Sequence, residues 1–311
     1  MWPCLLISKA ALTMGLSPSS LPSDTLVHLQ AFLAERRERE DRFRALAEKA
    51  EREQAVRVTE SEKVRRQGDG GEGDNGLPLA SQEIDFSMDL FEEDWQMSQF
   101  WYDLATQQAL AEEVSFADLG FCTHPLPEPE LKIINVAIVS APSVFVHLLR
   151  LQHQNIVPPN IHPVLLEYDS RFAVLCNPGS TARFFPYDFN HPLQLPANLQ
   201  GTFDAVLVDP PFLSAECQAG AAVTVRWLLK HVSEEDTLPL KKGVGRRVVV
   251  CTGERVTGFV ERYYAKEGVK ETDWEVRHER GLGNEFRCFA SYESARWRWA
   301  NKTVLAVERD K

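Results

Sequence analysis

The stretch Phe203–Phe212, which reads FDAVLVDPPF, decides the fold. Its apolar residues Ala205–Val208 have the length of a buried strand, and Asp209 follows them directly. The two consecutive prolines that come next remove two backbone donors and fix two φ angles, so the strand must end there. We expect the turn to project Asp209 and Phe212 beyond the strand and to leave the carbonyl of Pro210 free to accept a hydrogen bond.

This arrangement predicts a site for an amine. A carboxylate and a carbonyl that lie side by side hold the two N–H groups of an amine, while an aromatic face packs on it. The string alone fits a second interpretation equally well. In that interpretation the prolines are a rigid stop and Asp209 is a capping residue.

Further apolar runs of strand length recur on both sides of this stretch, with helix-compatible segments between them. They are continuously apolar, which is typical of strands buried on both faces of a largely parallel sheet. The sequence therefore predicts a doubly wound α/β domain with ligands at the carboxyl ends of its strands. The other predicted strands are Ile133–Val139, Val164–Glu167, Arg183–Phe185, Val248–Cys251, Trp274–Arg277 and Phe286–Tyr292, and the predicted helices are Asp103–Glu113, Val144–Gln152, Ala215–Leu229 and Arg255–Glu267.

The string Asp209–Phe212 resembles the [D/N/S]-P-P-[Y/F/W] motif of class I methyltransferases that methylate amino groups with S-adenosylmethionine. In that fold the motif ends the fourth strand, and here three predicted strands precede it. The resemblance implies that Glu167, at the end of the second strand, binds the ribose hydroxyls of the cofactor, with Asp169 as a second candidate. It implies that Asp188, after the third strand, accepts from the adenine amino group. Taken singly, each acid is more often a surface or capping carboxylate.

The loop after the first strand departs from the usual pattern. Most such folds place a glycine-rich loop there, which lets the backbone approach the cofactor. This chain has the small residues Ser140, Ala141 and Pro142 and no glycine.

The departure itself matches a specific family. Six strings in collinear order between Leu90 and Glu293 resemble the eukaryotic lysine methyltransferases of translation elongation factor 1-alpha, earlier grouped with adenine-specific DNA methyltransferases. That family also has Ser-Ala-Pro in place of the glycine loop. The strings are DWQMSQFWY, VSAPSVF, LEYDSRFA, VDPPFLSAEC, CTGE and NEFRCF.

The resemblance implies a Rossmann-like class I methyltransferase: a seven-stranded, mostly parallel sheet with helices on both faces. The expected catalytic residues are Asp209, Pro210 and Phe212. The expected cofactor-binding residues are Gln99, Trp101, Ser140, Ala141, Pro142, Glu167, Asp169, Asp188 and Asp209, with Gln99–Tyr102 at the methionine end. Asn284, Glu285 and Arg287 are candidates for facing the protein substrate, although polar residues at a strand edge explain them equally well.

The motif identifies an amine without saying which one. A lysine of elongation factor 1-alpha is favoured by the resemblance, and an adenine of DNA or RNA, flipped against Phe212, is the alternative. The net charge of −11 gives no basic surface of the kind that grips phosphates, so nucleic acid is disfavoured.

The chain divides by composition into four segments: a disordered leader at 1–22, a charged helix at 23–67, a flexible acidic linker at 68–82 and the methyltransferase domain at 83–311. Met14 is an alternative start. Six widely spaced cysteines favour reduced thiols in the cytoplasm, and the histidine spacing gives no metal site. We expect a monomer without a membrane segment, because no apolar run approaches the ~18 residues that a membrane span requires.

Overall fold

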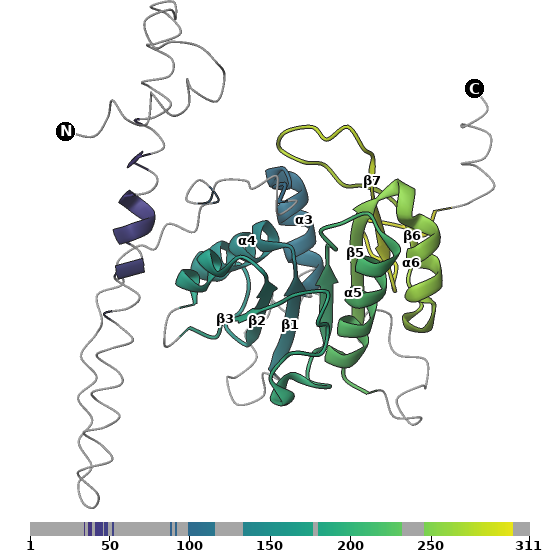
Figure 1. Cartoon of the computed structure of the whole chain (residues 1–311), viewed down its shortest axis with the longest axis horizontal. Coiled ribbons are helices and arrows are strands. Elements are labelled where there is room, and N and C mark those ends of the chain that lie inside the picture. Colours follow the sequence, from purple (N-terminus) through teal and green to yellow (C-terminus); the bar gives the residue numbers. More distant parts are fainter. Residues whose placement is uncertain are drawn as a thin grey trace, which may run out of the picture. The chain divides into compact units, whose positions relative to one another are not determined.

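The computed structural model (Figure 1) describes residues 99–115, 133–176, 180–231 and 246–300. It also describes Met88, Phe91 and residues 34, 37, 38, 41–45, 47, 48 and 52. The chain divides into two compact units, one of Met1–Arg52 with Asp89–Phe91 and one of Glu53–Met88 with Glu92–Lys311.

In the first unit, every described residue between 34 and 52 is α-helical and most of their side chains are exposed. Asp41 pairs with Arg44 at 3.2 Å, and the rings of Phe43 and Phe91 meet edge-on at 6.0 Å. The predicted leader at 1–22, the linker at 68–82 and both ends of the predicted helix at 23–67 lie outside the described residues, so these boundaries stay predictions.

A seven-stranded sheet forms the centre of the second unit, in the order β3-β2-β1-β4-β5-β7-β6. The pairs among β1–β5 are parallel, and β7 runs antiparallel to both of its neighbours. This topology confirms the predicted Rossmann-like class I methyltransferase fold. The strands are β1 Ile134–Val139, β2 Ile161–Glu167, β3 Arg183–Pro186, β4 Ala205–Val208, β5 Arg247–Gly253, β6 Lys270–Glu275 and β7 Phe286–Ala290.

Strands β2, β5 and β6 begin earlier than the sequence predicts, β5 by a single residue. The prediction started β2 after Pro163, but the strand begins at Ile161, which pairs with Ile134 of β1. A proline is tolerated there because β3 pairs with β2 only from Val164 onward. Strand β6 begins at Lys270 instead of Trp274, because its first residues pair with the end of β7.

Helices cover both faces of the sheet, because alternate strand residues face opposite sides. Ala137 and Val139 of β1 share a buried cluster with Val225 and Val260 of the helices on one face. Ile138, which lies between them along the strand, is equally buried and faces the opposite side, where the helices α3 (Leu104–Val114) and α4 (Pro142–His153) pack together. The helices are α3 Leu104–Val114, α4 Pro142–His153, α5 Ala215–Leu228 and α6 Thr257–Tyr263, and short 3-10 turns flank α6 at Glu254–Val256 and Ala265–Glu267.

Within the described part of the chain, no helix combines the length and the apolar character needed to cross a membrane. These same residues contain no cluster of three or more His, Cys, Asp or Glu side chains that could hold a metal ion.

Candidate functional site

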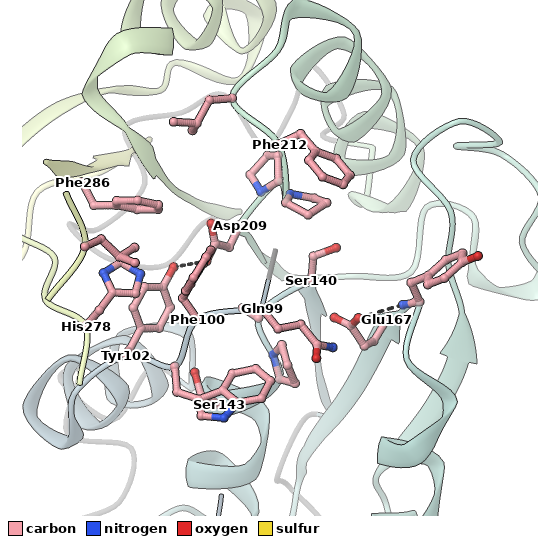
Figure 2. Close-up of a pocket in the computed structure, with 18 of the residues that line it drawn as sticks. Gln99, Phe100, Tyr102, Ser140, Ser143, Glu167, Asp209, Phe212, His278 and Phe286 are labelled. Atoms are coloured by element: carbon pink, nitrogen blue, oxygen red, sulfur yellow. Dashed lines mark hydrogen bonds between the residues drawn. The ribbon is translucent and has the colours of Figure 1, made fainter. Parts of the chain in front are cut away.

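The site lies where the strand order changes direction. The chain runs from β1 to β2 on one side, while β4 pairs with β1 on the other, so a crevice opens at the carboxyl ends of β1 and β4. Two backbone hydrogen bonds fix this edge: the Asp209 amide donates to the Val139 carbonyl at 3.0 Å, and the Ser140 amide donates to the Leu166 carbonyl at 2.9 Å. A cavity of about 580 Å³ occupies the crevice (Figure 2).

The cavity brings together ten of the eleven predicted site residues, which come from segments far apart in the sequence. They are Gln99, Trp101, Ser140, Ala141, Pro142, Glu167, Asp188, Asp209, Pro210 and Phe212.

Asp169 does not line the cavity. Its carboxylate pairs with Arg171 at 2.6 Å and accepts a hydrogen bond of 3.2 Å from the Gln99 amide. The Arg171 bonds and Gln99 hold the pKa of Asp169 below its ordinary value, although burial opposes them. Asp169 therefore reaches the cavity through its hydrogen bonds with Gln99 and Glu167, and of the two acids at the end of β2 only Glu167 borders it.

The predicted amine-binding groups stand together at one end. Asp209 and Pro210 line the cavity, and Phe212, which is 42% exposed, meets the ring of Phe189 edge-on at 5.6 Å. The Tyr102 hydroxyl donates a hydrogen bond to Oδ2 of Asp209 (Figure 2). Burial raises the pKa of Asp209 to about 7, and the Glu167 charge acts in the same direction, while the Tyr102 bond opposes both.

Glu167 stands at the other end of the cavity and is held by its own backbone. Its Oε1 accepts from the amides of Tyr168 and Asp169 at 2.9 and 3.1 Å, which fixes the plane of the carboxylate. Burial raises the pKa of Glu167 to about 7 against these two bonds. A buried carboxyl group in this state gains from a ligand that donates hydrogen bonds to it.

Asp188 sits at the cavity rim in a different environment. It accepts from the Asn190 amide at 2.9 Å and lies 3.1 Å from Nδ1 of His191. These bonds, the Asn190 amide first, lower the pKa of Asp188, so it is an ionised acceptor at neutral pH.

The loop between β1 and α4 explains how the chain manages without glycine. Ser140 has φ 54°, in the left-handed region that glycine usually occupies. Ala141 then occupies the N-cap position of α4, without a side-chain capping bond, and Pro142 takes the first helical position, where the missing N–H costs no hydrogen bond. The small side chains keep the backbone at the cavity surface.

Several cavity residues were missed at the sequence level. Tyr168, 68% exposed, directly follows Glu167, and this adjacency was the available signal. His278 gave none: it reaches the cavity because residues 101–103 pair with residues 277–279, through a bridge between Tyr102 and His278. Its ring lies 4.9 Å from that of Tyr102 and 4.4 Å from that of Phe286, another lining residue.

The three residues that were candidates for facing the protein substrate lie in different places. Asn284 lines the cavity, whereas Glu285 and Arg287 do not. Arg287 pairs with Glu285 at 2.7 Å and with Glu254 at 3.6 Å, where the start of β7 pairs with the end of β5.

The cavity is electrostatically suited to cations. Among the described residues its lining includes Glu167, Asp188 and Asp209 but no Lys or Arg. His278 adds no positive charge at neutral pH, because burial lowers its pKa to about 4.

Comparison with known proteins finds one matching family and several relatives that are named as lysine methyltransferases. The sequence profile of the family described as "Probable N6-adenine methyltransferase" matches residues 93–294. The protein-lysine N-methyltransferase EFM5 of Saccharomyces cerevisiae is 36% identical over 69% of this chain and 78% of the yeast protein. EEF1A lysine methyltransferase 1 of Homo sapiens is 34% identical over 67% of this chain and 79% of the human protein. The protein-lysine N-methyltransferase CG9154 of Drosophila melanogaster is 28% identical over 88% of this chain and 94% of the fly protein.

Proposed function

This chain belongs to the family described as probable N6-adenine methyltransferases, and we propose that it transfers methyl groups from S-adenosylmethionine to a lysine of translation elongation factor 1-alpha. One observation carries the proposal: Asp209, Pro210 and Phe212 share a single cavity with Glu167 and Asp188. The family relatives EFM5 and EEF1A lysine methyltransferase 1 are named as protein-lysine methyltransferases.

The chemistry of the lining fits S-adenosylmethionine. Glu167 is a buried acceptor with a fixed plane, suited to two ribose hydroxyls, and Asp188 is an ionised acceptor for an amino group. The backbone at Ser140 approaches the cavity without a large side chain. When bound, the cofactor supplies an activated methyl group on a positively charged sulfur, and its cation complements a lining that has no Lys or Arg.

The chain's own residues then align the amine. The Asp209 carboxylate and the Pro210 carbonyl accept hydrogen bonds from the N–H groups of the amine, and Phe212 packs on the alkyl chain. The nitrogen lone pair then points away from these three groups. A lysine must first lose its proton; moving its pKa from ~10.4 to near 7 costs roughly 4 kcal/mol. Desolvation and a neighbouring cation both favour the neutral amine. Asp209 favours the ammonium form, and we therefore assign it to orientation and not to proton abstraction.

Lysine is preferred over adenine because of charge. A nucleic acid would have to bring phosphates to a cavity lined by three carboxyl groups and no Lys or Arg among the described residues. A protein lysine brings a cation. Methylation of an adenine amino group remains the second candidate, because the family's description refers to that reaction.

The remaining assignments are part of the same proposal. The protein partner is elongation factor 1-alpha, by analogy with the human relative's name, and the cytoplasm is the compartment in which the two would meet. We propose that the enzyme acts as a monomer.

A transfer assay tests the proposal. The full-length chain is incubated with methyl-labelled S-adenosylmethionine and either purified elongation factor 1-alpha or adenine-containing oligonucleotides. We expect label on a lysine of the factor, and a loss of about 100-fold or more for Asp209→Ala, because orientation of the amine is lost. Asp273→Ala is the matched control, since Asp273 is exposed on β6 and outside the cavity lining. Label on the oligonucleotides alone, or full activity of Asp209→Ala, would contradict it.

A further inference from the structure

Tyr102 is a buried side chain in the cavity that the proposed reaction does not yet use. It is 1% exposed, lines the cavity and donates its hydroxyl hydrogen to Oδ2 of Asp209. We propose that Tyr102 is a positioning residue. Its hydroxyl holds one carboxylate oxygen of Asp209, so that the ionised carboxylate keeps the orientation that receives the substrate amine. This inference rests on the proposed function for the identity of the amine, and on the geometry alone for the pairing.

The position of the Tyr102 hydroxyl is fixed from several directions. The Tyr102 carbonyl accepts a hydrogen bond of 2.6 Å from the Gln107 side chain, and Tyr102 pairs with His278 in an isolated β-bridge. The neighbouring Asp103 caps α3 by accepting from the Thr106 amide at 2.8 Å. The hydroxyl is therefore preplaced by backbone and helix-cap contacts that do not involve the ligand.

A carboxylate needs such an anchor for its geometry. An unanchored Asp209 could present either oxygen to the cavity, because rotation about its terminal torsion is broad. The Tyr102 bond occupies Oδ2, so Oδ1 is left as the acceptor for an amine N–H in the cavity that Pro210 also lines. Small losses of alignment of this kind reduce methyl-transfer rates strongly.

The hydrogen bond from Tyr102 also affects the ionisation of Asp209. A protonated Asp209 would donate a hydrogen bond to the amine lone pair and block the attack. The titratable groups around Asp209 are Tyr102, Glu167, Cys217 on α5 and Cys251 on β5, with His278 next to Tyr102.

Of these groups, only Tyr102 donates a side-chain hydrogen bond to Asp209, and this bond lowers the pKa of Asp209, which burial and the charge of Glu167 raise to about 7. The pKa of Tyr102 itself lies well above its ordinary value, first because of burial, so the hydroxyl keeps its proton at every working pH.

Tyr102→Phe removes the hydroxyl and keeps the ring. The matched control is Tyr292→Phe, which removes a hydroxyl that also donates to a buried carboxyl group, Glu113 at 3.2 Å, outside the cavity lining. Both variants are studied as full-length chains.

The first readout is the pH profile of kcat/KM for S-adenosylmethionine between about pH 6 and 9, which reports the ionisation of the free enzyme. With the pKa of Asp209 raised by about one further unit, Tyr102→Phe should be about tenfold slower than wild type at the acid end. The deficit should shrink severalfold at the alkaline end, while Tyr292→Phe follows the wild-type profile. A deficit of the same size at every pH, or none, would overturn the inference.

The second readout does not depend on any methyl acceptor. Calorimetry in buffers of different ionisation enthalpy counts the protons released when S-adenosylmethionine binds at about pH 7.5. Tyr102→Phe should release roughly half a proton more than wild type, because more Asp209 is protonated before the cation arrives, and Asp209→Ala should release less. An unchanged count in Tyr102→Phe would overturn the inference even if the factor is methylated. The predicted counts with an unmethylated factor would instead refute only the proposed substrate.

Discussion

Glu167 and Asp209 are kept in positions that reduce the stability of the ligand-free protein. Burial raises the pKa of Glu167 from 4.5 to about 7, so the folded protein holds this proton in a pH range where the unfolded chain releases it. Stability therefore falls as pH rises from about 4.5 to 7 and stays low above that range. A carboxyl group that served only the fold would gain from an ion-pair partner, and Glu167 has none among the residues that the structure describes.

Glu167→Gln should separate the two effects. At pH 8 the free energy of unfolding of the ligand-free protein should rise by about 1–3 kcal/mol, because no buried charge remains, and at pH 4 it should not change. Affinity for S-adenosylmethionine should fall about 10- to 100-fold, because charge-assisted hydrogen bonds are lost. Denaturant titrations and calorimetry measure the two quantities.

Glu267→Gln is the control for this experiment. The Glu267 side chain is equally buried, but it pairs with Arg226 at 2.8 Å away from the cavity. Its replacement should lower stability and leave cofactor affinity unchanged. A Glu167→Gln protein that is less stable at pH 8, or that binds the cofactor as wild type does, would contradict the assignment.

At the scale of elements, the β1–α4 loop shows that a residue other than glycine can adopt the backbone conformation that glycine usually supplies at this place in the fold. Ser140 adopts φ 54° without being glycine, and its amide donates to the Leu166 carbonyl of the neighbouring strand. A non-glycine residue in this region costs on the order of 1 kcal/mol. Such strain persists where the surrounding structure determines it, and here the loop borders the cavity.

Ser140→Gly should therefore raise the free energy of unfolding by up to about 1 kcal/mol, and Ser140→Val should lower it by more. Ser143→Gly, which is within the first turn of α4, should have the opposite sign to Ser140→Gly, with a loss of about 0.5–1 kcal/mol. Urea titrations of the three variants measure these changes in the free energy of unfolding. Equal destabilisation by both glycine substitutions would show that the φ of Ser140 carries no strain.

The sequence was sufficient for the strands because burial on both faces leaves a simple apolar signal. All seven predicted strands are present, and the Asp-Pro-Pro turn ends β4 where expected. It was not sufficient for contacts made by pairing of distant segments. Nothing local in the sequence indicates that Tyr102 would bridge to His278, since that contact depends on how residues 101–103 meet residues 277–279. The sequence keeps Asp169 as a second candidate beside Glu167, because only the structure shows that Asp169 pairs with Arg171.

At the scale of the whole molecule, the charge distribution agrees with a protein substrate more than with a nucleic acid. The net charge is −11, and nine acidic residues without any Lys or Arg lie between Asp69 and Asp94. The family match, residues 93–294, contains every residue of the proposed site. The segments before it at 1–82 are outside the chemistry described above, and their predicted boundaries are independent of it.

The central claim is that one cavity holds both the nucleoside and the reacting amine. A crystal structure of the full-length protein with S-adenosylhomocysteine tests it most directly. The account predicts ribose hydroxyls on Glu167, the adenine amino group near Asp188, and the sulfur facing Asp209 and Pro210 with Phe212 across the opening. A nucleoside bound away from Glu167, or a sulfur separated from Asp209 by other side chains, would contradict it.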